Sequence, residues 1–283
     1  MAGSTLVTEL PAYYLPLGRT GDHEHFMPTE HTVSVWGDDL QHGGPPIGLL
    51  ARSLLRHQPD PAHAFTRVTV DILGAIGMAE NRIHTTVLRP GKQISLVQSE
   101  LSVRQVDGTY RTAARAQGWR MATAETSEVV HLPTPPLTPA PDEIEAAPGM
   151  TGIGPLVGEW ATKGFVGTLD CRIASSDPEV GREVWVRPNF PLVAGEQTTD
   201  IEKFFTVLDI ANGIGSTLAF SEWTFMNTDT TVHLHRQPVG EWTGIKARMT
   251  VGPQGYGLTG AELFDGSGAV GRSAQTLLIR SVG

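Results

Sequence analysis

The residues whose types and spacing best suit chemistry begin at His42, where a histidine and two glycines precede a helical pattern. Gly43 and Gly44 allow the backbone to adopt a positive φ or to come close to another group. Pro45 and Pro46 suit the first turn of a helix, where backbone N–H groups have no partner within the helix. Because N–H groups at a glycine turn or helix start can stabilise an oxyanion, Gly43 and Gly44 are candidate donors.

Two histidine-containing segments could suggest a metal. His23, Glu24 and His25 follow one another closely, and His233 and His235 lie on one face of a predicted strand. Neither group has a regular ligand spacing with a third ligand nearby, as a metal site requires. We therefore expect no metal and no cofactor.

Two further segments match the sequence patterns of known functional motifs but not the structural context that those motifs require. Residues 266–271 read Gly-Ser-Gly-Ala-Val-Gly, as in a dinucleotide-binding turn, but they lie between two strands and not between a strand and a helix. Residues 271–274 begin like a nucleophile elbow, but Gln275 replaces the final glycine. Both motifs are better explained as parts of an ordinary hairpin.

The elements that must position any site follow from the hydrophobic spacing. Ile47, Leu50, Ala51 and Leu54 recur at helical intervals and predict a buried helix over 45–56. Residues 65–120 then alternate between polar and apolar side chains in about four long segments. These segments are separated by turn sequences such as Asp107-Gly108, so they predict an antiparallel meander.

The second half of the chain repeats this order. Leu263 follows Leu101 by 162 positions, Thr231 follows Val68 by 163, and the hairpin turns keep the same register. A second buried helix is expected over roughly 209–220. We therefore divide the chain into an N-terminal repeat at 1–125, a proline-rich linker at 126–150 and a C-terminal repeat at 151–283, each repeat an α+β unit of one helix on an antiparallel sheet.

Composition narrows the class of protein. The 283 residues carry a formal charge of −9 with no long basic run, which argues against nucleic acid and against an anionic membrane surface. Cys171 is the single cysteine, so no intrachain disulfide can form. No apolar run reaches the roughly 20 residues of a membrane span, and residues 1–14 lack the pattern of a secretory signal. We expect a cytoplasmic protein.

The chain resembles the acyl-CoA thioesterase II (TesB-like) family of double hot-dog thioesterases. The resemblance rests on His42-Gly43-Gly44 before the first helix and on Arg89-Pro90-Gly91-Lys92 between two strands. It covers nearly the whole chain. It implies a double hot-dog fold, in which an antiparallel sheet wraps a central helix twice over, and hydrolysis of an acyl-CoA to free CoA and a fatty or other acyl acid.

The resemblance also implies three catalytic residues in the second half. The family has an aspartate at the second helix, a threonine on the strand after it and a glutamine on the last strand. Here Asp209, Thr250 (counted eight residues on from Trp242) and Gln275 occupy these places. A buried carboxylate can act as a general base, while a hydroxyl and a carboxamide can hold the attacking water.

The substrate and the assembly follow from the same resemblance. Coenzyme A carries phosphates, which an acidic protein must meet with local positive charge. Arg89 and Lys92 are candidates for this role, and His42 is a third candidate for contact with the substrate. Members of this family usually pair further, so we expect a homodimer.

Two other functions remain open from the sequence. Hot-dog enoyl-CoA hydratases use an aspartate and a histidine just before the central helix, and Asp38 and His42 stand there with a spacing one residue short. A non-catalytic protein that binds acyl thioesters would share the fold. Release of free thiol, loss of enoyl absorbance, or binding without turnover distinguishes the three.

Overall fold

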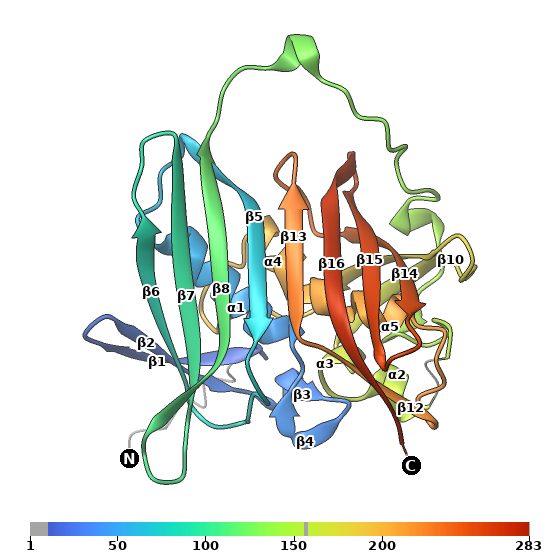
Figure 1. Cartoon of the computed structure of the whole chain (residues 1–283), viewed down its shortest axis with the longest axis horizontal. Helices are drawn as coiled ribbons and strands as arrows, with labels where there is room; N and C mark the ends of the chain where they lie inside the picture. The colour runs from blue at the N-terminus through green and yellow to red at the C-terminus, as the bar shows by residue number, and fades with distance from the viewer. Residues whose placement is uncertain (1–10, 156–157, 283) are drawn as a thin grey trace, which may run out of the picture.

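One antiparallel sheet runs across the molecule and carries the central helices on one face (Figure 1). This computed structural model describes residues 11–155 and 158–282, and within them the sheet has fourteen strands. Residues 1–10, which hold most of the segment examined for a secretory signal, lie outside the described residues.

The first half begins with a hairpin and a short two-stranded sheet, followed by a helix and four long strands. Its elements are β1 (Tyr14–Thr20), β2 (His23–Pro28), η1 (Glu30–Thr32), β3 (Val33–Ser34), β4 (Gly37–Gln41), α1 (Gly44–Arg56), β5 (His63–Ile72), β6 (Asn81–Arg89), β7 (Ile94–Arg104) and β8 (Tyr110–Ala122).

A connecting segment and the second half follow. The connection contains η2 (Ser127–Val129), η3 (Pro141–Glu143) and β9 (Ala147–Pro148). The second half contains α2 (Glu159–Thr162), α3 (Gly164–Gly167), β10 (Leu169–Ser175), β11 (Arg182–Pro188), α4 (Asp200–Val207), η4 (Leu208–Ile210), α5 (Ala211–Gly215), β12 (Trp223–Asn227), β13 (Asp229–Leu234), β14 (Thr243–Val251), β15 (Tyr256–Asp265) and β16 (Gly268–Ser281).

The sheet order is nearly symmetric about its centre. The strands run β1-β2-β6-β7-β8-β5-β13-β16-β15-β14-β11-β10-β9, and β12 pairs with β16. The two halves join where β5 and β13 pair, with Val70 opposite Thr230. Strands β6 and β14 begin and end 162 residues apart, at 81 and 243 and at 89 and 251. The structure therefore repeats one helix-and-sheet unit, although the exact repeat boundaries at 125 and 151 stay predictions.

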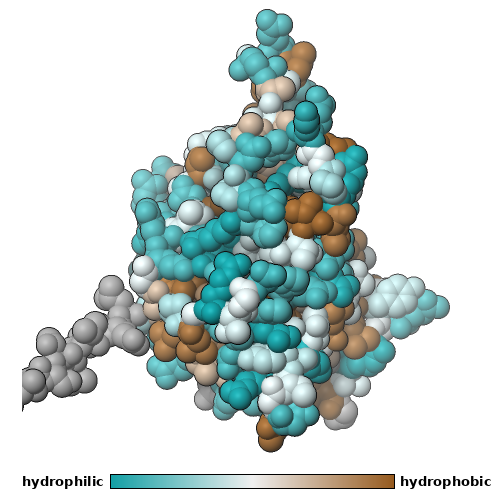
Figure 2. All heavy atoms as spheres, turned by 90° about the vertical axis from the view of Figure 1, so that its left-hand side faces the viewer, coloured by the Kyte–Doolittle hydropathy of each residue, from teal (hydrophilic) through white to brown (hydrophobic). Residues whose placement is uncertain are grey.

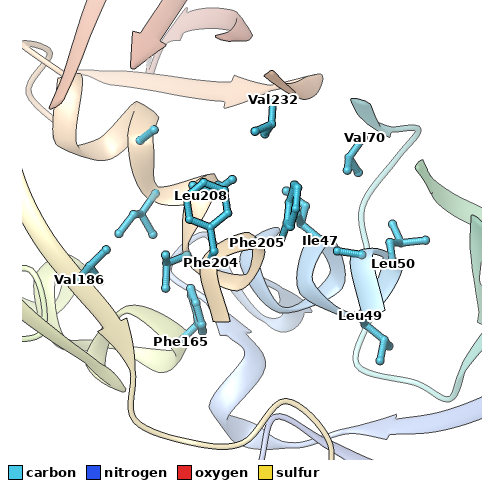
Figure 3. Packing of buried hydrophobic residues seen from close by; sticks show 14 of the residues in the cluster. Ile47, Leu49, Leu50, Val70, Phe165, Val186, Phe204, Phe205, Leu208 and Val232 are labelled. Atoms are coloured by element: carbon cyan, nitrogen blue, oxygen red, sulfur yellow. The ribbon is translucent and has the colours of Figure 1, made fainter. Parts of the chain in front are cut away.

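Helix α1 confirms the predicted buried helix over 45–56. Gly43 is its N-cap, Pro45 and Pro46 fill its first turn, and it ends at Arg56 before the prolines at 59 and 61. In Figure 3, Ile47 of α1 lies beside Phe205 of α4, below Val70 and Val232 of the central strands. The core is thus continuous across the two halves.

The second helical segment differs from the predicted helix at 209–220. It begins at Asp200, because Thr199 and Glu202 form a capping box: Glu202 N donates to Thr199 Oγ1, and Thr199 N donates to the Glu202 carboxylate. It then runs through α4, η4 and α5 and ends at Gly215. Asp209 therefore lies inside a broken helical segment and not at its start.

The connecting segment rises from the end of β8 and arches above the ends of the central strands toward the second half (Figure 1). Its second part packs against the second half, where buried Leu137 contacts Trp185 and Phe264. Trp185 Nε1 also donates to the carbonyl of Pro139 at 2.9 Å. These contacts attach the proline-rich segment to the outer face of the sheet.

The face beside β6 is mostly hydrophilic, with small separated hydrophobic patches (Figure 2). Among the helices of the described residues, none combines the length and the apolar character needed to cross a membrane.

Candidate active site

Asp209 of η4 lies where the two halves of the chain meet. The residue is only 5% exposed. Asn227, the last residue of β12, donates from Nδ2 to Asp209 Oδ1 at 2.7 Å. The other carboxylate oxygen, Oδ2, lies 3.2 Å from Nδ1 of His42, which directly precedes the N-cap of α1. The first half thus contributes the imidazole, and the second half contributes the carboxylate and the amide that fixes it.

Gly43 shows why a glycine stands at the start of α1. Its φ is −62°, so a left-handed conformation is not required. A Cβ built at this position would lie 2.6 Å from Asp209 Oδ2. The helix can therefore approach the carboxylate this closely only without a side chain. Of the two roles left open by the sequence, close approach is the one that the structure shows.

Strands β13 and β16 bring Thr230 and Gln275 to the same buried site. Thr230 is 1% exposed and Gln275 is 0% exposed. Gln275 Nε2 donates to Thr230 Oγ1 at 3.0 Å and to the backbone oxygen of Asp209 at 3.3 Å. Within the described residues, Gln275 Oε1 is buried without a hydrogen-bond partner. Since buried amide oxygens are normally paired, this atom is an acceptor available to a ligand.

Thr250, by contrast, does not reach this site. It lies near the end of β14, opposite Leu258 of β15, and it is exposed. Counting from Trp242 led to β14, whereas the threonine beside Asp209 is on β13. The signal for Thr230 was present, because the resemblance places this threonine on the strand after the helix and residues 230–235 read as that strand. Asn227 had no comparable sequence signal.

The state of His42 follows from its neighbours. The backbone N–H of Gly44 donates to His42 Nδ1 at 3.1 Å, so in the neutral ring Nδ1 is the acceptor and Nε2 carries the proton. Burial lowers the pKa of His42 below 6.5, and the nearby Asp209 charge only partly opposes this shift. At neutral pH, Nδ1 and Asp209 Oδ2 are therefore two acceptors 3.2 Å apart. A proton delivered to Asp209 can form a hydrogen bond between them.

The candidate oxyanion donors at α1 are fewer than the sequence suggested. The N–H of Gly44 is already used by His42, and Pro45 and Pro46 have none. The N–H of Ile47 donates to the carbonyl of Gly43. In the part of the chain that the structure describes, the Gly43 N–H is thus the remaining free donor in this first turn.

Arg89 and Lys92 lie at the opposite end of α1. Their turn borders a surface cleft of about 200 Å³ that also includes Gln58, just beyond the helix. Arg89 Nη1 donates to the carbonyl of Ile94 at 2.6 Å. The 13 residues of α1 separate this turn from Asp209 by about 20 Å, at 1.5 Å per residue. Contact of Arg89 and Lys92 with a distant part of a long substrate stays a prediction.

Other groups considered from the sequence are not assembled into a site. Across residues 11–155 and 158–282, no three histidine, cysteine or acidic side chains come together as metal ligands. Cys171 is fully buried in β10, and burial raises the pKa of its thiol. This makes Cys171 a poor nucleophile, because the thiolate is the reactive form.

Two family models match the chain. The model of the acyl-CoA thioesterase N-terminal domain matches residues 32–121, and the model of the C-terminal domain matches residues 139–279. The chain belongs to the acyl-CoA thioesterase family. Members of this family hydrolyse the thioester bond of acyl-CoA, and a buried carboxylate at the meeting of the two domains is suited to that reaction.

Solved structures support the fold of this acyl-CoA thioesterase. A conserved hot-dog protein of unknown function from Alicyclobacillus acidocaldarius has a TM-score of 0.68 and 13% identity, covering 92% of this chain and 94% of its own. The acyl-CoA thioesterase II TesB2 from Mycobacterium marinum has a TM-score of 0.64 and 15% identity, covering 92% and 93%. The predicted double hot-dog fold is confirmed. The search of curated proteins found no match.

Proposed function

We propose that this thioesterase hydrolyses acyl-CoA with Asp209 as the general base. The observation that carries the proposal is the buried cluster around this carboxylate. Asn227 holds one of its oxygens, and His42 can share a proton with the other. Gln275 Nε2 donates to the backbone oxygen of Asp209, and within the described residues Gln275 Oε1 has no hydrogen-bond partner. A carboxylate in such surroundings can take a proton from a bound water.

In the proposed reaction a water hydrogen-bonds to Asp209 and to Gln275 Oε1. Asp209 accepts a proton as the water oxygen attacks the carbonyl carbon of the thioester. The proton then lies between Asp209 Oδ2 and His42 Nδ1, which favours its transfer to the carboxylate. The Gly43 N–H supports the developing oxyanion. When the C–S bond breaks, the proton passes to the leaving sulfur, so the products are the acid and free CoA.

The decisive variant is Asp209→Asn, which keeps the size of the side chain but removes its basicity. General base catalysis contributes about 10²–10⁴-fold, so kcat for acyl-CoA should fall by about that factor. Thiol release measures the rate, and circular dichroism confirms folding. A folded Asp209→Asn protein that works at the wild-type rate would exclude this mechanism.

The same pair of groups supports a second candidate, an enoyl-CoA hydratase. An imidazole and a carboxylate 3.2 Å apart can also add and remove protons on either side of a double bond. The pair in the structure is His42 with Asp209. Asp38, the partner considered from the sequence, forms an ion pair with Lys163 at 2.6 Å. Loss of enoyl absorbance without thiol release would favour the hydratase.

We also propose a cytoplasmic homodimer that acts on fatty or other acyl groups. The terminal strand β1 lies at one edge of the long sheet, where only its first residue, Tyr14, is bridged to Val193, so in the described chain the rest of its outer edge pairs with no further strand. Pairing between subunits commonly relieves such an edge. Light scattering should give twice the mass of one chain at micromolar concentration. A strict monomer would contradict this assembly.

A further inference from the structure

A small apolar pocket adjoins the catalytic carboxylate. Its volume is about 30 Å³, and the residues that form it come mainly from the turn between β3 and β4, from α2 and α3, from the segment after Asp209 and from β12. Three of them touch the site directly. His42 lies beside Asp209 Oδ2, Ile210 follows Asp209 in the chain, and Asn212 Nδ2 donates to Asn227 Oδ1 at 3.2 Å.

Four aromatic rings close this pocket, and we call Trp36, Trp160, Phe220 and Phe225 the aromatic cluster. The Trp36 and Trp160 centroids are 4.8 Å apart, and those of Trp160 and Phe220 are 5.1 Å apart. Phe225 contacts both Phe220, at 4.9 Å, and Trp36, at 6.0 Å. Phe220 and Phe225 are only 7% and 2% exposed, so the inner wall is fixed by packing.

The position and the lining of the pocket indicate that it binds an alkyl group. Apart from His42 and Asn212, every lining residue is apolar, so the pocket suits an alkyl group and not a nucleotide. A thioester carbonyl placed beside Asp209 would direct its acyl chain toward this neighbouring apolar surface. We propose that the aromatic cluster receives the acyl group and restricts the enzyme to short acyl chains, from acetyl to butyryl. This inference rests on the proposed function.

The small volume of the pocket favours short acyl chains over long ones. About 10–15 Å³ of such cavity space holds one water molecule, so a volume of about 30 Å³ admits roughly two groups of that size. A longer chain must displace aromatic side chains that are packed against one another. One methylene too many in an apolar pocket changes the specificity constant by about 10- to 200-fold. A propyl group would press on the half-buried Trp36 and Trp160, whereas a long chain would also have to displace the buried Phe220 and Phe225.

A graded set of substrates tests the restriction. The intact protein is assayed for kcat/KM with acetyl-, butyryl-, octanoyl- and palmitoyl-CoA by thiol release. We expect butyryl-CoA to exceed octanoyl-CoA by about tenfold or more. In Trp160→Ala the pocket opens, and the ratio of octanoyl to butyryl activity should rise by about tenfold. Trp242→Ala is the matched control, because this half-buried tryptophan packs outside the pocket, over Arg172 and Arg187.

The outcomes separate the two proposals. Equal or better activity of the wild-type protein with octanoyl- or palmitoyl-CoA would overturn the restriction and leave the proposed function intact. An unchanged ratio in folded Trp160→Ala would also overturn it, and Trp36→Ala serves if the first variant does not fold. No thiol release with any acyl-CoA would overturn the proposed function, and the inference with it.

Discussion

Gly43→Ala adds a single methyl group directly against the carboxylate of Asp209, the proposed general base. The new Cβ would lie 2.6 Å from Oδ2, 2.7 Å from Cγ and 2.8 Å from Oδ1 of Asp209. Ordinary contacts begin at 3.4 Å, so Asp209 and the start of α1 must separate by about 0.8 Å. The carboxylate cannot move freely, because Asn227 holds Oδ1 and the side chain is buried.

This displacement sets the expected loss of activity. A misplacement of about 1 Å in a catalytic group can cost about 10²-fold, so kcat for acyl-CoA should fall by about two orders of magnitude. The fall should appear in kcat, since the base is displaced while the acyl pocket is not filled. Steady-state thiol release measures it, and thermal unfolding shows how far the fold itself is affected.

Gly260→Ala is the matched control for Gly43→Ala. Gly260 lies on β15 with nothing within 4 Å of the added methyl, so this variant should retain both the wild-type rate and the wild-type melting temperature. The reasoning is refuted if folded Gly43→Ala hydrolyses acyl-CoA as fast as Gly260→Ala. In that case the contact between α1 and Asp209 has no part in catalysis.

Three further results are expected. Thr230→Val should lower kcat about tenfold by removing a hydrogen bond worth about 1.4 kcal/mol, whereas exposed Thr250→Val should leave thiol release unchanged; equal losses would contradict the placement of the site. Because burial lowers the pKa of His42, the neutral ring persists below pH 6.5 and the acidic fall in kcat/KM should lie below that value; a midpoint above pH 6.5 would argue against proton sharing. Burial raises the pKa of Glu196, but the hydrogen bonds and charges of Arg52 and Arg56 outweigh it and lower the pKa overall. The ion pairs of Glu196 with these two arginines therefore stabilise the fold above pH 4.5, and this stabilisation is lost as pH falls through the folded pKa. Glu196→Gln should accordingly cost about 1–3 kcal/mol at neutral pH and little in acid, as denaturant unfolding at the two pH values will show.

Much of the fold could be predicted from the sequence, because the spacing of apolar residues and the positions of prolines determine the helices and strands locally. Ile47, Leu50 and Leu54 recur at helical spacing, and prolines mark both ends of the first helix, so α1 was predicted to within one residue. The nearly constant offset of 162–163 residues was visible because the alternation of a strand and the residues of a hairpin turn are local features of the sequence. Asp209 and Gln275 were found through the family resemblance, and the structure brings both to one buried cluster.

Only the tertiary structure decided which other groups join them. Thr230 and Thr250 both stand on strands with alternating side chains, and the pairing of β13 with β5 and β16 determines which one is buried beside Asp209. The contact of Asn227 with Asp209 depends on how β12 lies against η4, and the contact of His42 with Asp209 depends on how α1 packs against the second half, across more than 160 residues. Spacing along the chain fixes neighbours within an element, whereas distances between elements follow from the packing of the whole core.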